Sequence, residues 1–242
     1  MHSKANPRPP GRLPARAFLE AAPELVAPQL LGMVLVHTVQ NGGRTQCLAG
    51  RIVEVEAYLG PNHHTPDPAA HSFRGPTPRN RVLFGPPGHA YVYSIYGQYF
   101  CMNIACEAEG QAGCVLLRAL EPLGPPAAVA RMARNRGLDP ELYRGGSLTP
   151  ATARQLTSGP SRLCQALGLT RAEHNGLDLL DPDSPLQLRK DGFPPVRPLV
   201  TPRIGIRHAV DWPLRFAIPG NPCVSGPARL RGGWGQIADP RA

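Results

Sequence analysis

Proline and glycine interrupt this chain so often that long regular elements are excluded from most of it. Its 242 residues include 30 Pro and 26 Gly, which are spread between apolar runs and do not form a low-complexity tract. Proline begins or ends helices and cannot pair inside a sheet, and glycine favours tight turns. We therefore expect a loop-rich fold of short elements, with the length of one large domain or two small ones.

The apolar pattern between these breaks predicts both helices and strands. The turn Asn41-Gly42-Gly43 is typical of a hairpin, and a long loop at residues 60–88 precedes an antiparallel meander. Antiparallel strands with helices grouped between them predict a single α+β domain. The expected helices are residues 14–21, 24–31, 125–136, 150–156 and 161–167, and the expected strands are residues 33–39, 45–58, 89–95, 98–104, 114–121, 177–180, 186–188, 202–207 and 214–218.

The first residues differ in composition from the rest. Residues 1–12 are basic and rich in proline, so we expect a flexible arm before a domain over residues 13–236, and no secretory signal. The arm is either an inert tail or a contact for a polyanion. No run reaches the ~18 apolar residues of a membrane span, which excludes a transmembrane protein. We expect a cytoplasmic or nucleoid location in a bacterium and a nuclear one in a eukaryote.

The chain is strongly basic, which favours a polyanionic partner. Lys+Arg number 26 against 17 Asp+Glu, a formal net charge of +9, and Lys4 and Lys190 are the only lysines. Schiff-base chemistry needs an amine that can lose its proton, which a guanidinium does not do in proteins. Lys4 lies in the arm and Lys190 in an expected turn. We therefore do not expect a lysine imine.

Neither the cysteines nor the histidines form a metal-binding pattern. The 6 Cys include no C-x-x-C pair, so reduced, mostly buried thiols are expected. Among the histidines, only a cluster in the long loop has the composition of a metal site, namely His63, His64 and His71 with Asp67. Their spacing does not match a zinc motif. We expect no metal and no cofactor.

One expected strand carries two carboxylates on one face. In a strand alternate side chains share a face. Alternation within residues 51–58 groups Ile52, Glu54, Glu56 and Tyr58. The small apolar residues between them face the core. The opposite face is either a solvated surface or a catalytic one, and the second interpretation gains weight because the strand runs directly into the long Arg- and His-containing loop.

Four of the 6 tyrosines lie within residues 90–100. Tyr91 and Tyr93 share a strand face, and Tyr96-Gly97 falls where a hairpin reverses. These aromatics are either an ordinary strand pair or a tip that enters an apolar environment from outside, as wedges that part stacked bases do. Together with the basic charge and Arg74, Arg79 and Arg81, they favour a nucleic-acid enzyme that works on a base.

Long, uncommon motifs follow one another in a fixed order along the chain. They are Arg51-Ile-Val-Glu-Val-Glu-Ala-Tyr-Leu-Gly60, Ala69-Ala-His-Ser72, Thr77-Pro-Arg-Asn-Arg81, Gly88-His-Ala-Tyr-Val-Tyr-Ser-Ile-Tyr-Gly97, Cys101-Met-Asn-Ile104 and Val115-Leu-Leu-Arg-Ala-Leu-Glu-Pro122. In order and spacing the chain resembles the alkyladenine (3-methyladenine) DNA glycosylase family of the animal type. Further similarity at residues 158–167, 202–206 and 214–216 extends the resemblance over roughly residues 12–228.

The resemblance implies a curved antiparallel sheet flanked by helices, with a protruding hairpin that inserts into the DNA minor groove. It implies a monofunctional glycosylase, active as a monomer on double-stranded DNA with damaged purines, that initiates base excision repair. The implied substrates are 3-methyladenine and 7-methylguanine, with hypoxanthine and ethenoadenine as further candidates. A neutral purine such as hypoxanthine also needs a proton donor, which the sequence does not identify.

The resemblance also implies the catalytic residues. Glu56 corresponds to the general base that activates a water, and Arg118 and the main chain of Ile204 help to hold that water. Glu54 lies two residues before Glu56 and is expected to have a structural or supporting role.

A second set of residues is implied for the base pocket. Tyr58, His71 and Tyr93 correspond to its walls, and electron-rich ring faces should attract a cationic alkylpurine more than a neutral base. Asn103 matches the position that hinders normal guanine through its exocyclic amino group, and Tyr96 corresponds to the residue that fills the gap left by the flipped nucleotide.

Three other functions remain open on the sequence. A non-catalytic lesion binder would use the tyrosines and not Glu56. A retaining glycosidase acting on sugars would use two carboxylates about 5 to 5.5 Å apart but gains nothing from the charge or the tip tyrosine. A bifunctional glycosylase with lyase activity would need a suitably placed amine.

Overall fold

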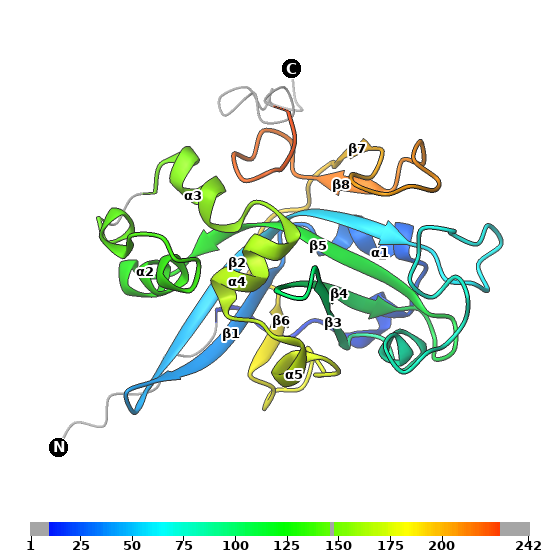
Figure 1. Ribbon diagram of the computed structural model, residues 1–242, viewed down its shortest axis with the longest axis horizontal. Helices are drawn as coiled ribbons and strands as arrows, with labels where there is room; N and C mark the ends of the chain where they lie inside the picture. The colour runs from blue at the N-terminus through cyan, green and yellow to red at the C-terminus, as the bar shows by residue number, and fades with distance from the viewer. Residues whose placement is uncertain (1–9, 146–147, 228–242) are drawn as a thin grey trace.

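An eight-stranded antiparallel sheet organises the chain (Figure 1). The computed structural model describes residues 10–145 and 148–227, so residues 1–9 of the expected arm and residues 228–236 of the expected domain lie outside the described residues. The strands are β1 Val34–Asn41, β2 Arg44–Tyr58, β3 Ala90–Ile95, β4 Tyr99–Cys106, β5 Gly113–Leu123, β6 Leu186–Arg189, β7 Leu199–Thr201 and β8 Arg215–Ala217.

Proline defines where the helices start. The helices are α1 Pro23–Leu30, α2 Pro126–Asn135, α3 Pro150–Thr157, α4 Pro160–Leu167 and α5 Arg171–His174. Proline is the first residue of α1 to α4, where its missing N–H leaves no hydrogen bond unmade. Gly168 ends α4 in the left-handed conformation (φ 71°). Short 3-10 turns occupy Arg16–Glu20, Arg81–Phe84 and Pro140–Tyr143.

The sheet curls around β2. Its strand order is β3-β4-β5-β2-β1-β6, and β8 pairs with β2 and β7. Along one edge of β2, β1 pairs as far as Arg51 and β8 takes over at Glu54. Along the other edge β5 pairs with Ala49 to Tyr58, and two register shifts leave Val53 and Arg118 without ladder partners. Such bulges bend a strand and re-aim its side chains. The predicted single α+β domain with a curved antiparallel sheet is confirmed.

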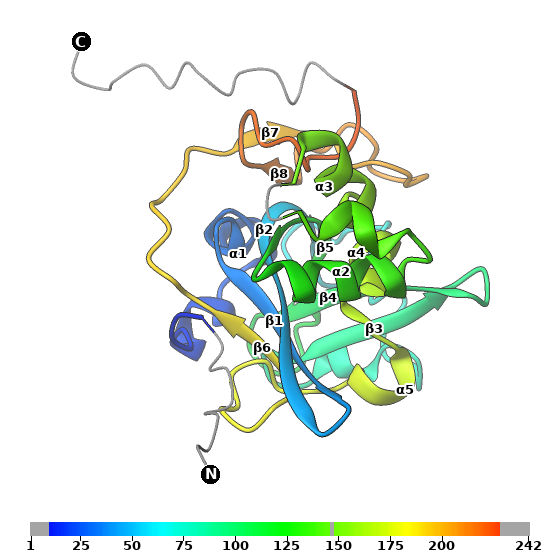
Figure 2. The ribbon, with the colours of Figure 1, turned by 90° about the vertical axis from the view of Figure 1, so that its left-hand side faces the viewer.

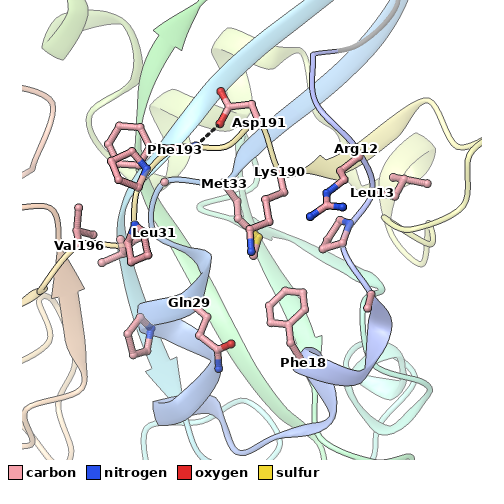
Figure 3. A pocket seen from close by; sticks show the side chains of 16 residues that line it. Arg12, Leu13, Phe18, Gln29, Leu31, Met33, Lys190, Asp191, Phe193 and Val196 are labelled. Atoms are coloured by element: carbon pink, nitrogen blue, oxygen red, sulfur yellow. Dashed lines mark hydrogen bonds between the residues drawn. The ribbon is translucent and has the colours of Figure 1, made fainter.

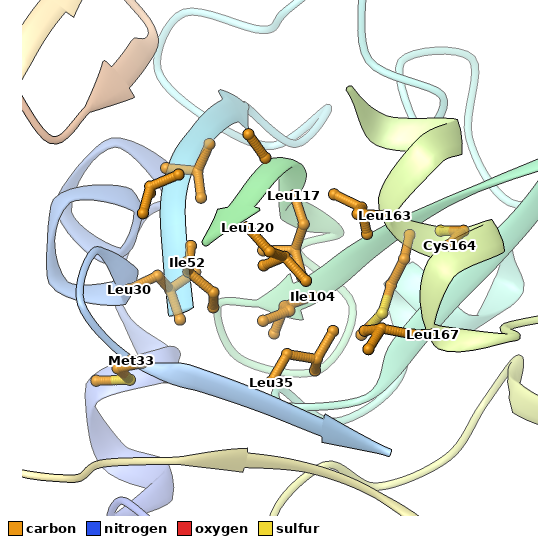
Figure 4. Close-up of a cluster of buried hydrophobic side chains, with 14 of the residues drawn as sticks. Leu30, Met33, Leu35, Ile52, Ile104, Leu117, Leu120, Leu163, Cys164 and Leu167 are labelled. Carbon is orange, nitrogen blue, oxygen red and sulfur yellow. The ribbon is translucent and has the colours of Figure 1, made fainter. Parts of the chain in front are cut away.

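The main apolar core lies between the sheet and the helices. Figure 4 shows Leu163, Cys164 and Leu167 of α4 facing residues of β1, β2, β4 and β5. Figures 1 and 2 show α2, α3 and α4 gathered on one side of the sheet. A smaller apolar cluster under the 60–88 loop includes Leu83, Tyr91 and Cys114. The 60–88 loop therefore covers a sheet face that carries aromatic and polar side chains.

Several expected elements differ from the structure. Residues 14–21 form only the short 3-10 turn, and residues 177–180 form a turn with a single bridge between Asp178 and His89. Residues 202–207 are a loop and not a strand; Pro202 has no N–H to donate, and the N–H of Ile204 is bound to a carboxylate. Ile52 belongs to the main core beside Val53, because the bulge at Val53 shifts the alternation.

The described cysteines and helices bear on two further expectations. The six cysteines all lie within the described residues and form no disulfide, and five of them are buried. Within residues 10–145 and 148–227, no helix combines the length and the apolar character needed to cross a membrane.

Two buried histidines connect β1 to the segment after α4. The Nε2 atoms of His37 and His174 are 3.0 Å apart, His37 Nδ1 lies 2.7 Å from the Leu167 carbonyl, and the Thr170 N–H donates to His174 Nδ1 at 3.1 Å. A carbonyl only accepts and an N–H only donates, so His37 carries its proton on Nδ1 and His174 on Nε2. His174 Nδ1 also lies 3.2 Å from the Thr170 carbonyl, which accepts when that ring is charged, so the chain of hydrogen bonds requires a neutral ring at His37.

We expect the free energy of unfolding to fall as the pH drops below about 6.5. Burial lowers the pKa of both histidines below its usual value, and the raising effects of the Leu167 and Thr170 backbone and of Glu173 are smaller. The unfolded chain then binds protons that the folded chain excludes. Urea unfolding at several pH values between about 5.5 and 7.5 measures the slope. His174→Gln should reduce this slope of the unfolding free energy against pH. Identical slopes in the variant and the unmodified protein would contradict the role assigned to the two histidines.

Candidate active site

A row of side chains crosses the sheet on the face under the 60–88 loop. Neighbouring strands pair residue by residue, so the register defines which side chains lie side by side. The row runs through Tyr91, Asn103, Leu116, Glu56 and Arg215. The period-two pattern predicted the positions of Glu56 and of Tyr91 on their own strands, and the register brings them into one line.

This face carries a cavity of about 430 Å³. Its lining includes Tyr58, His71, Tyr93, Asn103, Arg118 and Ile204, which are six of the eight expected site residues. The walls come from β2, β3, β4 and β5, from the 60–88 loop and from the loop after β7. Tyr96 lies apart from it at the tip of the β3–β4 hairpin, and Glu56 lies beneath the lining.

Glu56 is held by three groups that do line the cavity. Its Oε1 accepts the Ile204 N–H at 2.8 Å and lies 3.2 Å from Arg118 Nη1, and its Oε2 accepts the Tyr58 hydroxyl at 2.9 Å. The side chain is 0% exposed. The interpretation of this face as a solvated surface is therefore wrong. The carboxylate does not open onto the cavity directly; it contacts the cavity through Tyr58, Arg118 and Ile204.

Glu54 lies behind Glu56 and shares Arg118 with it. Its carboxylate accepts Arg118 Nε at 2.9 Å, Arg215 Nε at 2.7 Å, and both the N–H and the hydroxyl of Ser225 at 2.6 and 2.7 Å. Burial raises the pKa of Glu54, but Arg118, Arg215 and Ser225 together outweigh that effect and lower it. Glu54 therefore stays ionised and fixes Arg118 from the side away from Glu56.

Arg203 supports the Tyr58 wall from behind. Its guanidinium lies 4.5 Å from the centre of the Tyr58 ring, donates to the Ala57 carbonyl at 3.0 Å and makes a two-pronged ion pair with Asp67. Both side chains of the pair are fully buried. Because Ile204 follows Arg203, the same pair places the Ile204 N–H at Glu56.

The opposite wall is aromatic. The His71 and Tyr93 rings meet edge to face with centres 4.6 Å apart, and Tyr91 stacks on Tyr93 at 5.3 Å. Burial raises the pKa of both tyrosines, and Cys101 adds to the effect at Tyr93 while Arg79 opposes it at Tyr91. Burial also raises the pKa of Tyr58, as does the neighbouring Glu56. All three phenols therefore keep their protons at neutral pH.

The tip of the β3–β4 hairpin is strained and exposed. Tyr96 is 92% exposed, and Figure 2 shows the turn extending beyond the body of the molecule. Tyr96 (φ 51°) and Gly97 (φ 71°) both have positive φ. A tyrosine in this region costs about 1–3 kcal/mol relative to an unstrained residue. Packing does not offset this cost, because the Tyr96 side chain is almost fully exposed. The residue is therefore better explained by binding than by stability.

Comparison with known proteins agrees with this geometry. Residues 17–222 match the family model described as methylpurine-DNA glycosylase. The chain belongs to this family. Its members are DNA glycosylases, enzymes of DNA repair, which fits an aromatic cavity beside a buried carboxylate on a basic protein.

Curated relatives of this glycosylase come from bacteria and an archaeon. A protein of Koribacter versatilis is 50% identical over 211 residues, covering 87% of this chain and 92% of its own length. One of Methanoculleus marisnigri is 46% identical over 217 residues (88% and 98%), and one of Burkholderia lata 44% over 226 residues (93% and 97%). All three carry the name "Putative 3-methyladenine DNA glycosylase".

The glycosylase has a larger cavity of about 890 Å³ that lies away from these residues. Figure 3 shows Phe18, Met33, Lys190 and Phe193 around it. Lys190 is thus remote from the aromatic cavity, whose lining includes no lysine. The smaller cavity is the candidate active site, because its lining includes the groups that contact Glu56.

The histidines of the long loop do not converge in the described part of the glycosylase. His63 contacts Glu24 at 3.1 Å, Asp67 is bound to Arg203, and His71 Nδ1 lies 3.2 Å from the Tyr91 hydroxyl. No group of three or more possible metal ligands forms among the described residues.

Sequence reasoning missed four supporting residues of this glycosylase. They are Asp67, Arg203, Arg215 and Ser225. Each acts through a partner more than 100 positions away in the chain, so no local pattern marks the contact. The only available signal is that Arg203 and Arg215 lie within two of the segments that resemble the family.

Proposed function

We propose that this chain is a monofunctional glycosylase that flips alkylated purines such as 3-methyladenine and 7-methylguanine out of duplex DNA and hydrolyses their glycosidic bond. We further propose that it acts as a monomer, resembles the animal type of the family in its site residues, and accepts hypoxanthine and ethenoadenine. The observation that carries the proposal is the buried Glu56 carboxylate held against the lining of the aromatic cavity by Tyr58, Arg118 and Ile204.

In this proposal the flipped purine stacks between Tyr58 and the wall of His71 and Tyr93. Flipping costs a few kcal/mol, and the cost is lowest for a damaged or mispaired base. Alkylation at N3 or N7 makes the purine cationic and a good leaving group. Glu56 stabilises the positive charge that develops on the sugar and accepts a proton from the attacking water.

Water must reach Glu56 for this chemistry. The three groups that cover the carboxylate also line the cavity, so displacement of a single side chain connects the carboxylate to it. Among the described residues, Oε2 accepts a hydrogen bond only from the Tyr58 side chain, whereas Oε1 is held by the Ile204 main chain and by Arg118. We place the incoming water at Oε2, where it replaces the phenol.

Base release from duplexes that each carry one lesion tests the function. We expect free 3-methyladenine and 7-methylguanine, with an abasic site left in the DNA. The full burial of Glu56 favours one competing function, a lesion binder without hydrolysis, which would bind the duplex and release no base.

Trapping with borohydride tests for a lyase and should give no covalent adduct, since Lys190 lies at the other cavity. A sugar glycosidase is disfavoured, because its acid needs a raised pKa and that of Glu54 is lowered.

Tyr96→Ala should reduce base release from duplex DNA about tenfold or more relative to release from a single strand, since one aromatic stacking contact is worth about 1–3 kcal/mol. The single strand needs no wedge to keep its base unstacked. Single-turnover rates on both substrates measure the ratio. Tyr99→Ala is the matched control: it removes an aromatic side chain that is 40% exposed on the same hairpin and should leave the ratio unchanged. Equal losses on both substrates in Tyr96→Ala would remove the wedge role.

A further inference from the structure

Each tyrosine wall of the cavity has an arginine on its ring. Arg203 lies 4.5 Å from the centre of Tyr58 and Arg79 lies 5.7 Å from the centre of Tyr93. Neither arginine is part of the cavity lining, so both sit behind the walls. A ring that already binds a cation attracts a second one less. The expected preference of these rings for a cationic purine is therefore weakened.

The two arginines differ in how their charge is balanced. Arg203 forms a buried ion pair with Asp67, which cancels most of its field at the cavity. Arg79 makes no ion pair within the described residues, and donates to the Ser94 carbonyl at 3.2 Å. Arg79 is therefore an uncompensated positive charge behind the base pocket, in addition to Arg207 in the cavity lining.

Arg79 lies in a second, smaller cavity that shares a wall with the first. This cavity of about 260 Å³ is lined by Arg74 and Arg79, among others, and His71 and Tyr91 line both cavities. A base in the larger cavity and the guanidinium of Arg79 are therefore separated by one layer of side chains. Arg79 acts on the pocket through that layer.

The layer consists of Tyr91 and His71, which are in contact. Arg79 and Tyr91 line the small cavity together, and the Tyr91 hydroxyl lies 3.2 Å from His71 Nδ1. Burial and, after it, the Arg79 charge lower the pKa of His71, which keeps the ring neutral at neutral pH.

We propose that Arg79 sets the lesion preference of the pocket: its positive charge behind Tyr93 and beside the Tyr91–His71 contact favours neutral purine lesions such as hypoxanthine over cationic alkylpurines. This inference rests on the proposed glycosylase function.

Arg79→Gln tests the inference through a ratio of rates. Single-turnover base release is measured at saturating enzyme from one duplex sequence that carries either hypoxanthine or 7-methylguanine. We expect the 7-methylguanine rate relative to the hypoxanthine rate to rise about twofold to fivefold, which is the size of one cation–π interaction at an exposed site. NMR titration should also show a raised pKa for His71. Arg79→Lys keeps the charge and should shift the ratio less.

Arg74→Gln is the matched control, because it removes the same charge from the same small cavity with no contact to Tyr91 or Tyr93 among the described residues. Its ratio should equal that of the unmodified enzyme. If Arg79→Gln slows both lesions equally, Arg79 is a DNA contact only and the inference is overturned while the glycosylase function stands. If the unmodified enzyme releases neither base, the function and the inference fall together. Should Arg79→Gln not fold, a twofold to fivefold rise of the ratio in Arg74→Gln would overturn the inference, because the loss of any charge from the small cavity would then be sufficient.

Discussion

Glu56→Gln should slow base release by about 10²- to 10⁴-fold, the contribution of a general base, while the enzyme still binds lesion-containing DNA. The amide has nearly the size of the carboxylate and keeps an oxygen for the Ile204 N–H. It cannot take a proton from water or stabilise positive charge on the sugar. Single-turnover release from a 7-methylguanine duplex at saturating enzyme measures the loss, and fluorescence anisotropy measures the affinity.

The rate and the affinity together distinguish a loss of chemistry from a loss of binding in Glu56→Gln. Saturating enzyme removes any effect of weaker binding from the rate, so a slow rate reports the chemical step. Glu121→Gln is a suitable control, since Glu121 lies on β5 and binds Asn221, outside the cavity lining. A Glu56→Gln enzyme that releases the base at the normal rate would contradict the assignment of the general base.

The local pattern of β2 and β3 predicted much of the site. Alternation placed Glu56 and Tyr58 on one face of β2, and Tyr91 and Tyr93 on one face of β3, and these positions follow from strand geometry alone. The family resemblance added Arg118 and Ile204, which the structure places against Glu56. No spacing within a strand could supply these two, because their contacts cross between strands and loops.

The errors have a physical cause as well. The bulge that shifts Ile52 into the core, and the one that re-aims Arg118, come from the pairing of β2 with β5 and leave no mark in the alternation of either strand. The loop at 202–207 has the apolar pattern of a strand, but its Ile204 N–H is bound to Glu56. In each place a tertiary contact overrides the local preference.

Both glutamates are buried, which the pattern of their strand did not predict. Two carboxylates on one strand face suggest solvation when the strand is considered alone, since an isolated buried charge is costly. Arg118 and Arg215 meet them from β5 and β8, so two cations balance two anions. The cluster is therefore neutral overall, and its stability depends on every member.

Glu54→Gln should lower the free energy of unfolding by about 3–5 kcal/mol, the usual cost of removing one partner of a buried ion pair. The substitution leaves Arg118 and Arg215 buried with Glu56 as the remaining anion, and it weakens the bonds that tie Ser225 to β2. For a chain of this size each kcal/mol corresponds to about 2–4 °C in Tm. Urea and thermal unfolding at neutral pH measure the effect. Glu56→Gln should be less destabilising, since Glu56 makes one ion pair of the cluster and Glu54 makes two, and Ile204 and Tyr58 can still bind the amide.

The pH dependence of the same variant identifies the charge as the cause. The pKa of Glu54 is lowered in the fold, so its carboxylate stabilises the fold above the usual carboxyl pKa and the contribution is lost as the pH falls through the folded value. The difference in stability between the unmodified protein and Glu54→Gln should therefore shrink in acid. If Glu54→Gln kept its Tm and lost all base release while Glu56→Gln remained active, the roles assigned to the two glutamates would be exchanged. We expect Glu54→Gln to lose stability and Glu56→Gln to lose base release. Glu54 is then the carboxylate that fixes Arg118, and Glu56 is the one that acts on water.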